Sequence, residues 1–439
     1  MPTTANMEKI TIFWFRRDLR LEDNTGLSYA YSTEKNVLPL FIFDTEILDK
    51  LEDKDDGRVS FIYQQVQKLD KQLQQMGTSL LVKYGKPLDI FEELFTQYDI
   101  QNIYTNRDYE PYAISRDTAI KKLAQHNGSQ FLDFKDHVIF EKEEIVNGSG
   151  EFYKVFTPYS KLWLEKFRTT KFSNQKLNPN KNSFFQTAPF PHPSLASMGF
   201  EPSSIEIPPL ERKEAIIRNY DKTRNFPGIS GTSRMGIHLR FGTISIRTLA
   251  QEAAQLNSTY LNELIWREFY IMILYHNPQV VEKAFKPKYD QISWRHDEND
   301  FAKWCSGETG YPIVDAGMRE LNATGYMHNR VRMIVASFLT KHLLIDYRWG
   351  EAYFARKLLD FELASNNGGW QWAAGTGTDA QPYFRIFNPE SQTEKFDKEL
   401  KYIKKWVPEY GTASYPKPIV EHKFARERAL ETFKSALAQ

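Results

Sequence analysis

The stretch 364–379 holds the densest set of side chains in the sequence that could do chemistry. Trp370 and Trp372, separated by one residue, stand among glycine, asparagine and threonine. Flat aromatic side chains among small residues suit a site that stacks planar rings, although a buried structural turn could use the same residues. Just beyond, the run 382–389 interleaves aromatic residues with Arg385, as a loop that faces nucleic acid would.

The turn 231–236 offers a second kind of chemistry, the binding of phosphate. It reads Gly-Thr-Ser-Arg-Met-Gly and leads into a helical run. Backbone N–H groups at a helix start, two hydroxyls and the guanidinium of Arg234 would together hold a pyrophosphate group. The alternative is an ordinary capped helix start with an incidental arginine, because serine and threonine are common caps.

A helical pattern near residue 266 combines charged and aromatic side chains. On a helix, Glu263, Trp266 and Arg267 share one face, because positions three and four apart are neighbours. The same spacing fits a functional site or a surface ion pair beside a core tryptophan. On spacing alone, the surface pair is the simpler interpretation.

The segment 326–333 opens a further helix with an apolar body. Asn329 and Met333 lie one turn apart on it, while Arg330 and Arg332 point elsewhere. Arginines on two faces could hold a phosphate on one side and a buried acid on the other. An amphipathic helix with solvated arginines is the alternative.

The elements that must position these residues begin with a β-rich region. The first third of the chain alternates short strand-like runs with amphipathic helical patterns at 58–76, 88–98 and 113–126. This alternation predicts an α/β fold with a doubly wound parallel sheet. The loop after the first strand reads Arg-Arg-Asp-Leu-Arg, which lacks the glycines of a dinucleotide-binding fingerprint. The predicted strands are 9–15, 37–44, 79–84, 102–106 and 130–134.

Three regions follow from the change of pattern along the chain. Residues 8–139 are expected to form the α/β domain. The proline-rich region 140–210 is typical of an irregular connector that wraps over a surface. Helical periodicity dominates 211–439, which predicts an all-α domain that carries most of the candidate residues.

Composition limits the classes of function. With 41% hydrophobic and 26% charged residues and a net charge of +1, the chain is typical of a globular protein, and DNA binding would need a local basic patch. Nine scattered histidines and a single cysteine predict no metal site and no disulfide framework. The polar N-terminus and the lack of a long apolar run predict a cytoplasmic protein without a membrane span.

Taken together, the motifs resemble the photolyase/cryptochrome family. The resemblance runs from Phe-Trp-Phe-Arg-Arg-Asp-Leu-Arg at 13–20 to Phe-Asn-Pro at 387–389. Its most specific part is the combination of 366–372 with 383–389. The resemblance implies an N-terminal α/β antenna domain and a C-terminal helical domain that holds FAD in a U shape.

Several positions would choose the class within the family. The (6-4) photolyases carry histidine where this chain has Asn329 and Met333. Cryptochromes of the DASH type usually have tyrosine at the position of Trp372, and plant cryptochromes place aspartate at the position of Asn366. The resemblance therefore favours a class I photolyase that splits cyclobutane pyrimidine dimers in UV-damaged DNA and acts as a monomer.

The resemblance also assigns roles to residues of this chain. The expected catalytic residues are Glu263, Asn329 and Asn366, with Asn366 facing N5 of the flavin. The expected FAD contacts are Tyr220, Thr232, Ser233, Arg234, Met235, Gly236, Arg267, Arg332, Asp360, Glu362 and Asn366. The expected contacts with the dimer or the DNA are Glu263, Trp266, Arg267, Asn329, Arg330, Met333, Trp372, Arg385 and Gln392.

The implied reaction is light-driven electron transfer. Excited, reduced FAD would donate an electron to a flipped-out dimer, whose cyclobutane bonds break before the electron returns. Glu263 would stabilise charge on a dimer carbonyl, and donation of a hydrogen bond requires it to be protonated. Burial against Trp266 would favour the protonated form.

A relay of aromatic residues would deliver electrons to FAD. Trp370 and Trp294 match the inner and outer tryptophans of the family, while Tyr347 stands at the middle position. Tyrosine is harder to oxidise without losing its proton, so electrons could be rerouted through Trp304 or Trp349. Repair needs no relay once FAD is reduced.

Two further positions depart from the family pattern. Gly236 replaces a common serine, and the lost hydrogen bond would cost about 0.5–1.5 kcal/mol. The acidic contact expected for a folate is not matched at Tyr112 and Ala113. A second, antenna chromophore therefore has no identity from sequence.

Two other functions remain open on sequence alone. A cryptochrome-type photoreceptor would keep FAD without repair, and usually carries a long C-terminal extension, whereas this chain ends soon after 387–389. A non-catalytic nucleic-acid-binding protein would use the aromatic and arginine turns without a flavin, and would be colourless when pure.

Overall fold

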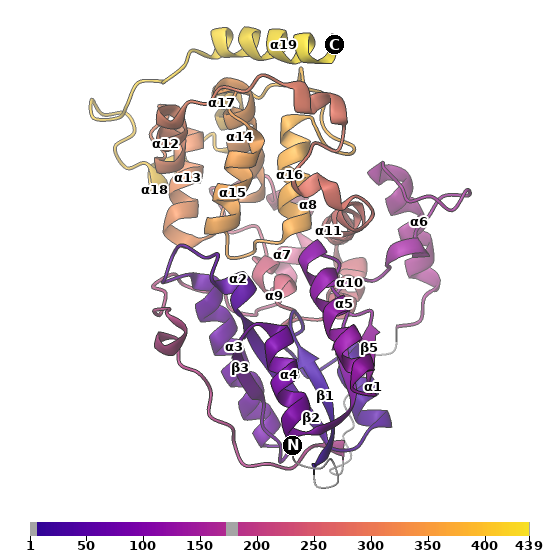
Figure 1. Cartoon of the computed structure of the whole chain (residues 1–439). Helices are drawn as coiled ribbons and strands as arrows, with labels where there is room; N and C mark the ends of the chain where they lie inside the picture. The colour runs from indigo at the N-terminus through magenta and orange to yellow at the C-terminus, as the bar shows by residue number, and fades with distance from the viewer. Residues whose placement is uncertain (1–6, 173–182, 439) are drawn as a thin grey trace. The chain divides into compact units, whose positions relative to one another are not determined.

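The computed structural model describes residues 7–172 and 183–438 (Figure 1). Residues 1–6, 173–182 and 439 lie outside the described part, and so does part of the expected connector. The chain forms two compact units. The first comprises 1–141, 169–210 and 235–251, and the second comprises 142–168, 211–234 and 252–439. The expected domain limits at 139 and 210 stay a prediction.

The first unit contains a parallel sheet of five strands in the order β3-β2-β1-β4-β5. β1 lies at its centre, where Phe13 pairs with Pro39 on one side and with Tyr104 on the other. The predicted parallel sheet is confirmed, with strand bounds that differ by at most three residues. The strands are β1 Lys9–Phe15, β2 Val37–Asp44, β3 Leu81–Gly85, β4 Asp99–Asn106 and β5 Gln130–Phe134.

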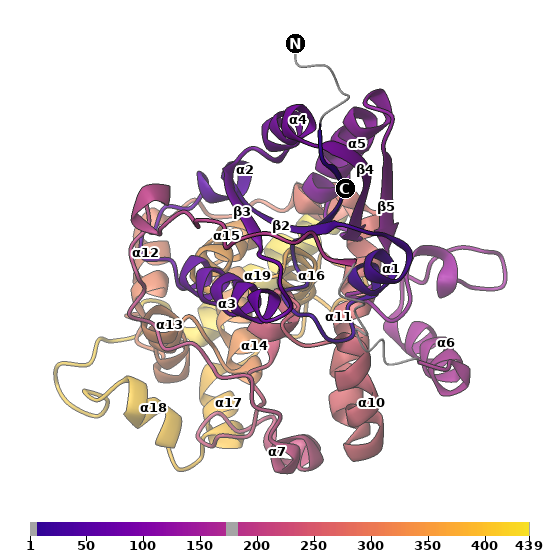
Figure 2. The same ribbon diagram turned by 90° about the horizontal axis from the view of Figure 1, so that it is seen from below.

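Side chains of β1 alternate between two cores. Phe13 and Phe15 join a core with Leu27 and Val66, whereas Ile12 and Trp14 join one with Phe91 and Ile120. Both faces are therefore buried, as a parallel sheet requires. Figure 2 shows α1 and α3 on one side of the sheet and α4 and α5 on the other. The helices of this unit include α1 Thr25–Thr33, α2 Thr45–Leu48, α3 Gly57–Gln74, α4 Pro87–Gln97, α5 Pro111–His126 and α9 Gly236–Arg240.

The second unit is helical, which confirms the predicted all-α character of this part of the chain. The π-helix η7 spans Phe338–His342 and continues α14. Among the described residues, no helix is both long and apolar enough to cross a bilayer. The α-helices here are α6 Phe156–Thr169, α7 Glu214–Arg218, α8 Tyr220–Thr223, α11 Ser258–His276, α12 Glu298–Ser306, α13 Pro312–Thr324, α14 Asn329–Ser337, α15 Tyr347–Lys357, α16 Leu363–Ala374, α17 Pro389–Phe396, α18 Lys401–Trp406 and α19 His422–Ala438. Helix α10 spans Ile246–Leu256 and runs from the first unit into the second.

Helix α6 departs from the expectation of an irregular region. The sequence predicts no helix within 140–210, yet α6 buries one apolar stripe formed by Phe156, Tyr159, Trp163 and Phe167. These positions recur every three or four residues, which is the period of an amphipathic helix. Pro158 lies in the first turn of the helix, where proline is tolerated, and the other prolines of 140–210 follow the helix. Its period could therefore have been found in the sequence.

Two glycines let α16 approach its neighbours closely. A Cβ at Gly350 of α15 would lie 2.1 Å from Cη2 of Trp370, and a Cβ at Gly368 would lie 2.2 Å from Cδ1 of Tyr270 on α11. Both distances are shorter than a van der Waals contact. Only glycine therefore permits these packed arrangements, which set the position of α16 and of the indole of Trp370.

Helix α19 packs on the π-helix through one aromatic ring. Phe433 is fully buried, and the Nζ of Lys341 lies 3.5 Å from its ring centre. The same Nζ donates to the carbonyl of Ala374, the last residue of α16, at 2.7 Å. His342 and His422 share a hydrogen bond of 2.8 Å between Nε2 and Nδ1. The Nη2 of Arg428 in α19 also donates to the carbonyl of His342 at 2.6 Å, so aromatic and polar contacts together hold this helix on the π-helix.

We expect Gly350→Ala to destabilise the protein by about 1–3 kcal/mol, because the added methyl overpacks the buried ring of Trp370. Thermal unfolding would measure the effect. The matched control is Gly369→Ala in α16, whose Cβ meets no atom within 4 Å. Removal of a helical glycine should make the control neutral, or more stable by up to about 1 kcal/mol. Equal melting temperatures for the two variants would contradict the packing argument.

Acidification should destabilise the protein through His342. Burial, then His422 and Arg428, lowers its pKa to about 3. In the unfolded chain this histidine takes up a proton as the pH falls below about 6.5, whereas in the folded protein it stays neutral. Proton uptake therefore stabilises the unfolded state, and the free energy of unfolding decreases as the pH falls below about 6.5. We expect the free energy of unfolding to fall between pH 7 and 5.5, and His342→Gln to reduce the slope. His328, whose pKa burial also lowers to about 3, should keep a residual slope. Identical slopes in the two proteins would refute the assignment.

Candidate active site

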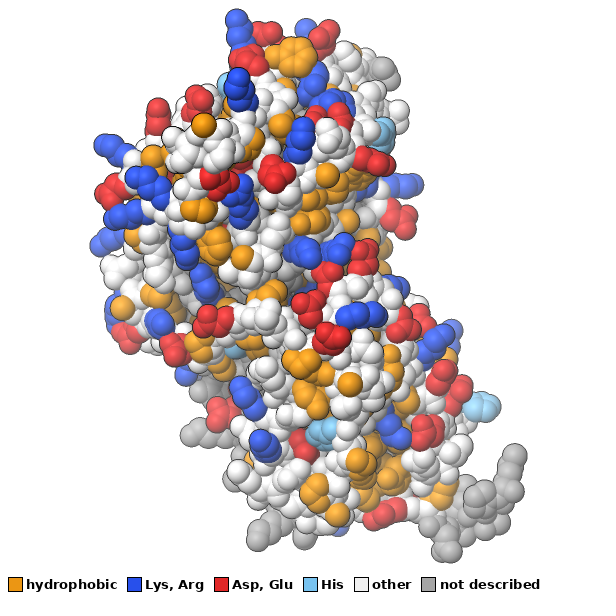
Figure 3. Space-filling view, turned by 90° about the vertical axis from the view of Figure 1, so that its left-hand side faces the viewer, with side chains coloured by type: hydrophobic (Ala, Val, Ile, Leu, Met, Phe, Trp, Pro, Cys, Tyr) orange, Lys and Arg blue, Asp and Glu red, His pale blue; other side chains and the backbone are white. Residues whose placement is uncertain are grey.

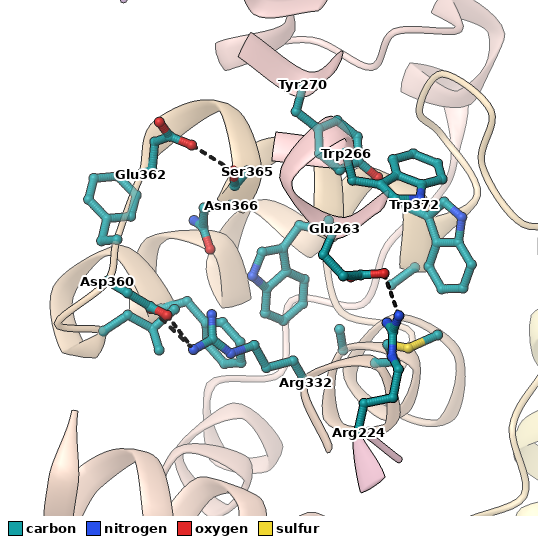
Figure 4. A pocket seen from close by; sticks show the side chains of 18 residues that line it. Arg224, Glu263, Trp266, Tyr270, Arg332, Asp360, Glu362, Ser365, Asn366 and Trp372 are labelled. Atoms are coloured by element: carbon teal, nitrogen blue, oxygen red, sulfur yellow. Dashed lines mark hydrogen bonds and ion pairs between the residues drawn. The ribbon is translucent and has the colours of Figure 1, made fainter. Parts of the chain in front are cut away.

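A cavity of about 360 Å³ opens within the second unit (Figure 4). Side chains of α11, α14, α15 and α16 surround it, together with the segment between α15 and α16. Nine of the residues singled out from sequence line this one cavity, although they come from distant parts of the chain. They are Glu263, Trp266, Arg332, Met333, Asp360, Glu362, Asn366, Trp370 and Trp372.

One side of the cavity carries a charged pair. The Nη2 of Arg332 lies 2.9 and 3.1 Å from the two carboxylate oxygens of Asp360. The Nε of Arg332 donates to the carbonyl of Met327 at 2.8 Å, which fixes the guanidinium plane. Burial opposes the charge of Arg332, but Asp360 outweighs it and raises the pKa of the arginine. The predicted pairing of Arg332 with Asp360 is present.

The amide of Asn366 is held beside this pair. Its Nδ2 donates to the backbone carbonyl of Glu351 on α15 at 3.0 Å. The next residue, Asn367, donates at 3.1 Å to the Glu351 carboxyl group. Burial raises the pKa of Glu351 to about 7. The Asn366 side chain is therefore oriented by α15 before any ligand arrives.

Glu362 connects α11 with α16. Its Oε1 lies 3.3 Å from Nη2 of Arg267, and its Oε2 accepts a hydrogen bond of 2.6 Å from Ser365. Arg267 itself does not line the cavity; it acts on the wall through Glu362. Of the three residues predicted to share one face of α11, Glu263 and Trp266 therefore line the cavity, whereas Arg267 lies behind its wall.

The opposite side of the cavity is aromatic. Figure 4 shows Trp266 and Trp372 there, with Glu263 and Arg224 next to them. Both tryptophans are partly exposed, so they present open surface to the cavity. The pair Trp370–Trp372 lies on a regular helix, α16, rather than in the turn considered from sequence. Their side chains point differently on it, because Trp370 is buried at 2% exposure.

Glu263 forms an ion pair with Arg224, which the sequence had not singled out. The Glu263 side chain keeps 34% of its exposure. The burial of Glu263 expected from sequence is therefore only partial, and the guanidinium of Arg224 lies against its carboxyl group. Burial works against the charge of Arg224, and Glu263 raises its pKa.

Positive charge gathers around the start of α14. His328 is buried there, and burial followed by four arginines lowers its pKa to about 3. Two buried atoms, Nε2 of His328 and Oδ1 of Asn329, have no hydrogen-bond partner among the described residues. Arg330 reaches Oδ1 of Asn225 at 2.7 Å. Such a region suits an anionic ligand with polar groups. The four arginines are Arg224, Arg234, Arg330 and Arg332.

The turn 231–236 does not line this cavity. The Thr232 hydroxyl lies 2.8 Å from that of Tyr326, and the Ser233 hydroxyl lies 2.9 Å from that of Tyr260. The guanidinium of Arg234 stacks 4.4 Å from the ring centre of Tyr326, and its φ of 54° is left-handed. Met235 is buried and Gly236 begins α9; both belong to the first unit.

Three more predicted contacts lie away from the cavity. The ring of Tyr220 lies 5.1 Å from that of Tyr260, next to the turn 231–236. Arg385 lies 5.7 Å from the ring centre of Phe387. Gln392 is in α17, where its backbone N–H bonds to Asn388. The structure places none of the three at the cavity wall.

The residues expected to relay electrons to FAD form two separate contacts, Trp294 with Tyr347 and Trp370 with Trp304. The rings of Trp294 and Tyr347 are 6.5 Å apart and perpendicular. Trp370 contacts Trp304 at 6.0 Å. The Tyr347 hydroxyl is buried without a hydrogen-bond partner among the described residues, and burial raises its pKa.

The sequence analysis does not single out three polar residues at the cavity, Tyr270, Arg224 and Ser365. Tyr270 follows Glu263 by seven positions and Trp266 by four, so helical spacing could have found it. Arg224 is 39 positions from Glu263 and lies outside every motif. Only the folded chain brings the pair together.

Comparison with known proteins agrees with this geometry. Residues 260–413 match a family model described as the FAD binding domain of DNA photolyase, and 11–180 match one described as DNA photolyase. The chain is 37% identical to the deoxyribodipyrimidine photo-lyase of Escherichia coli, over 97% of this chain and 98% of that one. It is 36% identical to that of a Synechococcus species, over 95% of both.

Solved structures show the same fold. A class III photolyase from Agrobacterium tumefaciens aligns over the whole of both chains with a TM-score of 0.85 and 32% identity. A cryptochrome from a Synechocystis species aligns over 98% of this chain and all of that one, with a TM-score of 0.83 and 25% identity. Since full-length relatives exceed 30% identity, the chain belongs to the photolyase/cryptochrome family.

Proposed function

We propose that this protein is a deoxyribodipyrimidine photo-lyase, an FAD-dependent enzyme that uses light to split cyclobutane pyrimidine dimers in DNA. The observation that carries the proposal is the two-sided cavity. One side holds the Arg332–Asp360 pair and Asn366, and the other holds two tryptophans and Glu263 (Figure 4). Such a cavity can keep a flavin and a pyrimidine dimer in contact. The full-length photo-lyase relatives support the same conclusion.

The residues present fit FAD. Gly369 lines the cavity, and a Cβ there would meet open space within 4 Å, so the backbone offers a flat approach. Arg332, Asp360 and Asn366 supply donors and acceptors for a polar ring edge, while Arg234 and the hydroxyls of 232–233 suit the phosphates. When bound, FAD supplies the light absorption and the electron. These residues bind and orient it.

The aromatic side receives the dimer. A nucleotide that leaves the DNA helix loses its stacking, and the open faces of Trp266 and Trp372 replace part of it. Met333 adds an adaptable apolar contact at the same wall. Two of the arginines near His328, Arg224 and Arg330, would draw the phosphates that flank the dimer.

Glu263 can act on a pyrimidine carbonyl only after its ion pair with Arg224 opens. In the structure its carboxyl group is paired with the guanidinium of Arg224. A DNA phosphate that competes for Arg224 would leave Glu263 in the aromatic pocket without its cation. A protonated Glu263 can then donate a hydrogen bond to the carbonyl.

The DNA surface depends on local charge. On the face in Figure 3, Lys and Arg side chains are interspersed with Asp and Glu, in line with the net charge of +1. The arginines near α14 therefore provide a local field rather than a global one. We propose Arg330, Arg385 and Gln392 as contacts with the DNA backbone. We propose Asn329, whose buried Oδ1 has no hydrogen-bond partner among the described residues, as a residue of the dimer site.

Electron supply to the flavin would run through Trp370. Oxidation of Tyr347 requires loss of its proton, but its buried hydroxyl has no acceptor among the described residues. Trp304 contacts Trp370 directly at 6.0 Å. We therefore favour Trp304 as the next residue of the relay, with Tyr347 and Trp294 as a slower branch.

The class I assignment rests on Asn329 together with three residues at the cavity. Asn366, Met333 and Trp372 stand where other members of the family carry different side chains. A second chromophore in the first unit and a monomeric state stay predictions. An archaeal photolyase from Sulfolobus tokodaii, 35% identical, is described with two FAD molecules, so a second flavin is one candidate.

Light should drive repair by the purified protein. We expect reduced protein to restore absorbance near the thymine band of an oligonucleotide that carries one thymine dimer, under blue light and not in darkness. Protein that carries FAD but restores no absorbance would instead support a cryptochrome-type photoreceptor. Colourless protein would contradict the flavin site.

Replacement of Glu263 should separate catalysis from cofactor binding. We expect Glu263→Ala to lower the repair yield roughly twofold to tenfold, the effect of one net hydrogen bond, while the FAD content stays near wild type. Glu263→Gln keeps a donor without the charge and should retain more of the yield. Equal losses of yield and FAD in both variants would remove Glu263 from the catalytic role.

A further inference from the structure

Helix α6 reaches the back of the substrate wall. The ring of Phe156, the first residue of the helix, stacks on the indole of Trp266 with centres 3.7 Å apart and planes 5° apart. Trp266 lines the cavity with the rest of its surface. Phe156 is 7% exposed, so this contact is a buried one. One face of Trp266 is thereby held against α6.

Three further contacts fix α6 on α11. The Nε1 of Trp163 donates to the buried carboxyl of Glu268 at 2.6 Å. The rings of Tyr159 and Phe269 lie 5.2 Å apart. Phe156 also meets Phe269 edge to face at 5.7 Å. Because Trp266, Glu268 and Phe269 are close in α11, the whole face behind the cavity wall rests on α6.

The start of α6 is tied to a distant turn. The backbone N–H of Phe156 donates at 3.1 Å to Oδ2 of Asp379, which lies 223 positions along the chain. The first N–H groups of a helix need such an external acceptor. Asp379 adopts a φ of 45°, a left-handed conformation that aspartate tolerates better than most residues. Thr378 adds a hydrogen bond of 2.5 Å to the carbonyl of Lys154.

We propose that Phe156 and Asp379 are positioning residues for the substrate pocket. Phe156 fixes the angle of the Trp266 indole by face stacking, and Asp379 fixes Phe156. The chain continues from this turn to Arg385, proposed above as a DNA contact, and its neighbour Phe384 is 61% exposed. Contact of DNA with the turn and stacking of the dimer on Trp266 are thus mechanically coupled. This inference rests on the proposed function, and within it these two residues contribute to the preference for DNA that carries a dimer.

The test compares two phenylalanines of the same helix. Phe156→Leu removes the ring that stacks on Trp266. Phe167→Leu is the matched control, because Phe167 stacks on Trp163, at 4.8 Å and 14°. For each protein we would measure FAD content, melting temperature, and dissociation constants in darkness for an oligonucleotide with one thymine dimer and for its undamaged counterpart.

We expect Phe156→Leu to weaken binding of the dimer oligonucleotide by about tenfold, since aromatic stacking gives a base much of its affinity. Binding of undamaged DNA and FAD content should change less than twofold. Phe167→Leu should keep the wild-type ratio of the two dissociation constants, even where its melting temperature falls equally. The inference would be overturned if Phe156→Leu kept the wild-type ratio of the two dissociation constants, or if both variants lost affinity for the dimer oligonucleotide equally. In either case the preference of the wild-type protein for the dimer would leave the proposed function intact.

Variants of Asp379 test the link to the turn. Asp379→Gly keeps the left-handed backbone but removes the acceptor, so dimer preference should fall severalfold. Asp379→Asn keeps an acceptor oxygen and tolerates the conformation, and should behave as wild type. Wild-type preference in the glycine variant would overturn the role of Asp379. A wild-type protein that does not distinguish dimer from undamaged DNA would overturn the proposed function, and this inference with it.

Discussion

The close approach of α16 to α11 and α15 is the constraint on which the cavity depends. At Gly350 and Gly368 the backbone lies against the rings of Trp370 and Tyr270, at distances that no Cβ would permit. Because these helices are so closely packed, the side chains that line the cavity between them are held at fixed angles. Asn366, hydrogen-bonded to the backbone of α15, points into that space because α15 and α16 cannot separate. The wall is therefore shaped before a ligand binds.

Charge is distributed unevenly around the rigid wall. Arg332 has a carboxylate partner in Asp360, and Arg224 has one in Glu263. Even so, His328 remains close to four arginines, and its pKa falls to about 3, through burial first and these cations next. The excess positive charge costs stability in the free protein, and an anionic ligand would offset that cost. A stability cost of this kind is expected at a functional site.

Much of the fold could be predicted because its signals are local. Strands β1 and β2 are apolar on both faces, and the helices that follow carry clear amphipathic periods, so the parallel sheet follows from the pattern. Helix α6 is not predicted because the prolines of 140–210, including Pro158 in its first turn, favour irregular structure, although its apolar spacing is visible in the sequence. Tyr270 could likewise have been read from its spacing on α11.

The sequence alone determined which residue types stand at which helical or strand positions, and so the class of fold, the family, and nine residues of one cavity. Only the tertiary structure decided how residues from distant segments meet. Arg224 with Glu263, Asp379 with Phe156, and Phe156 with Trp266 are pairs separated by 39 to 223 positions. No periodicity links such residues, because their distance in space is set by helix packing and not by the local repeat of the backbone.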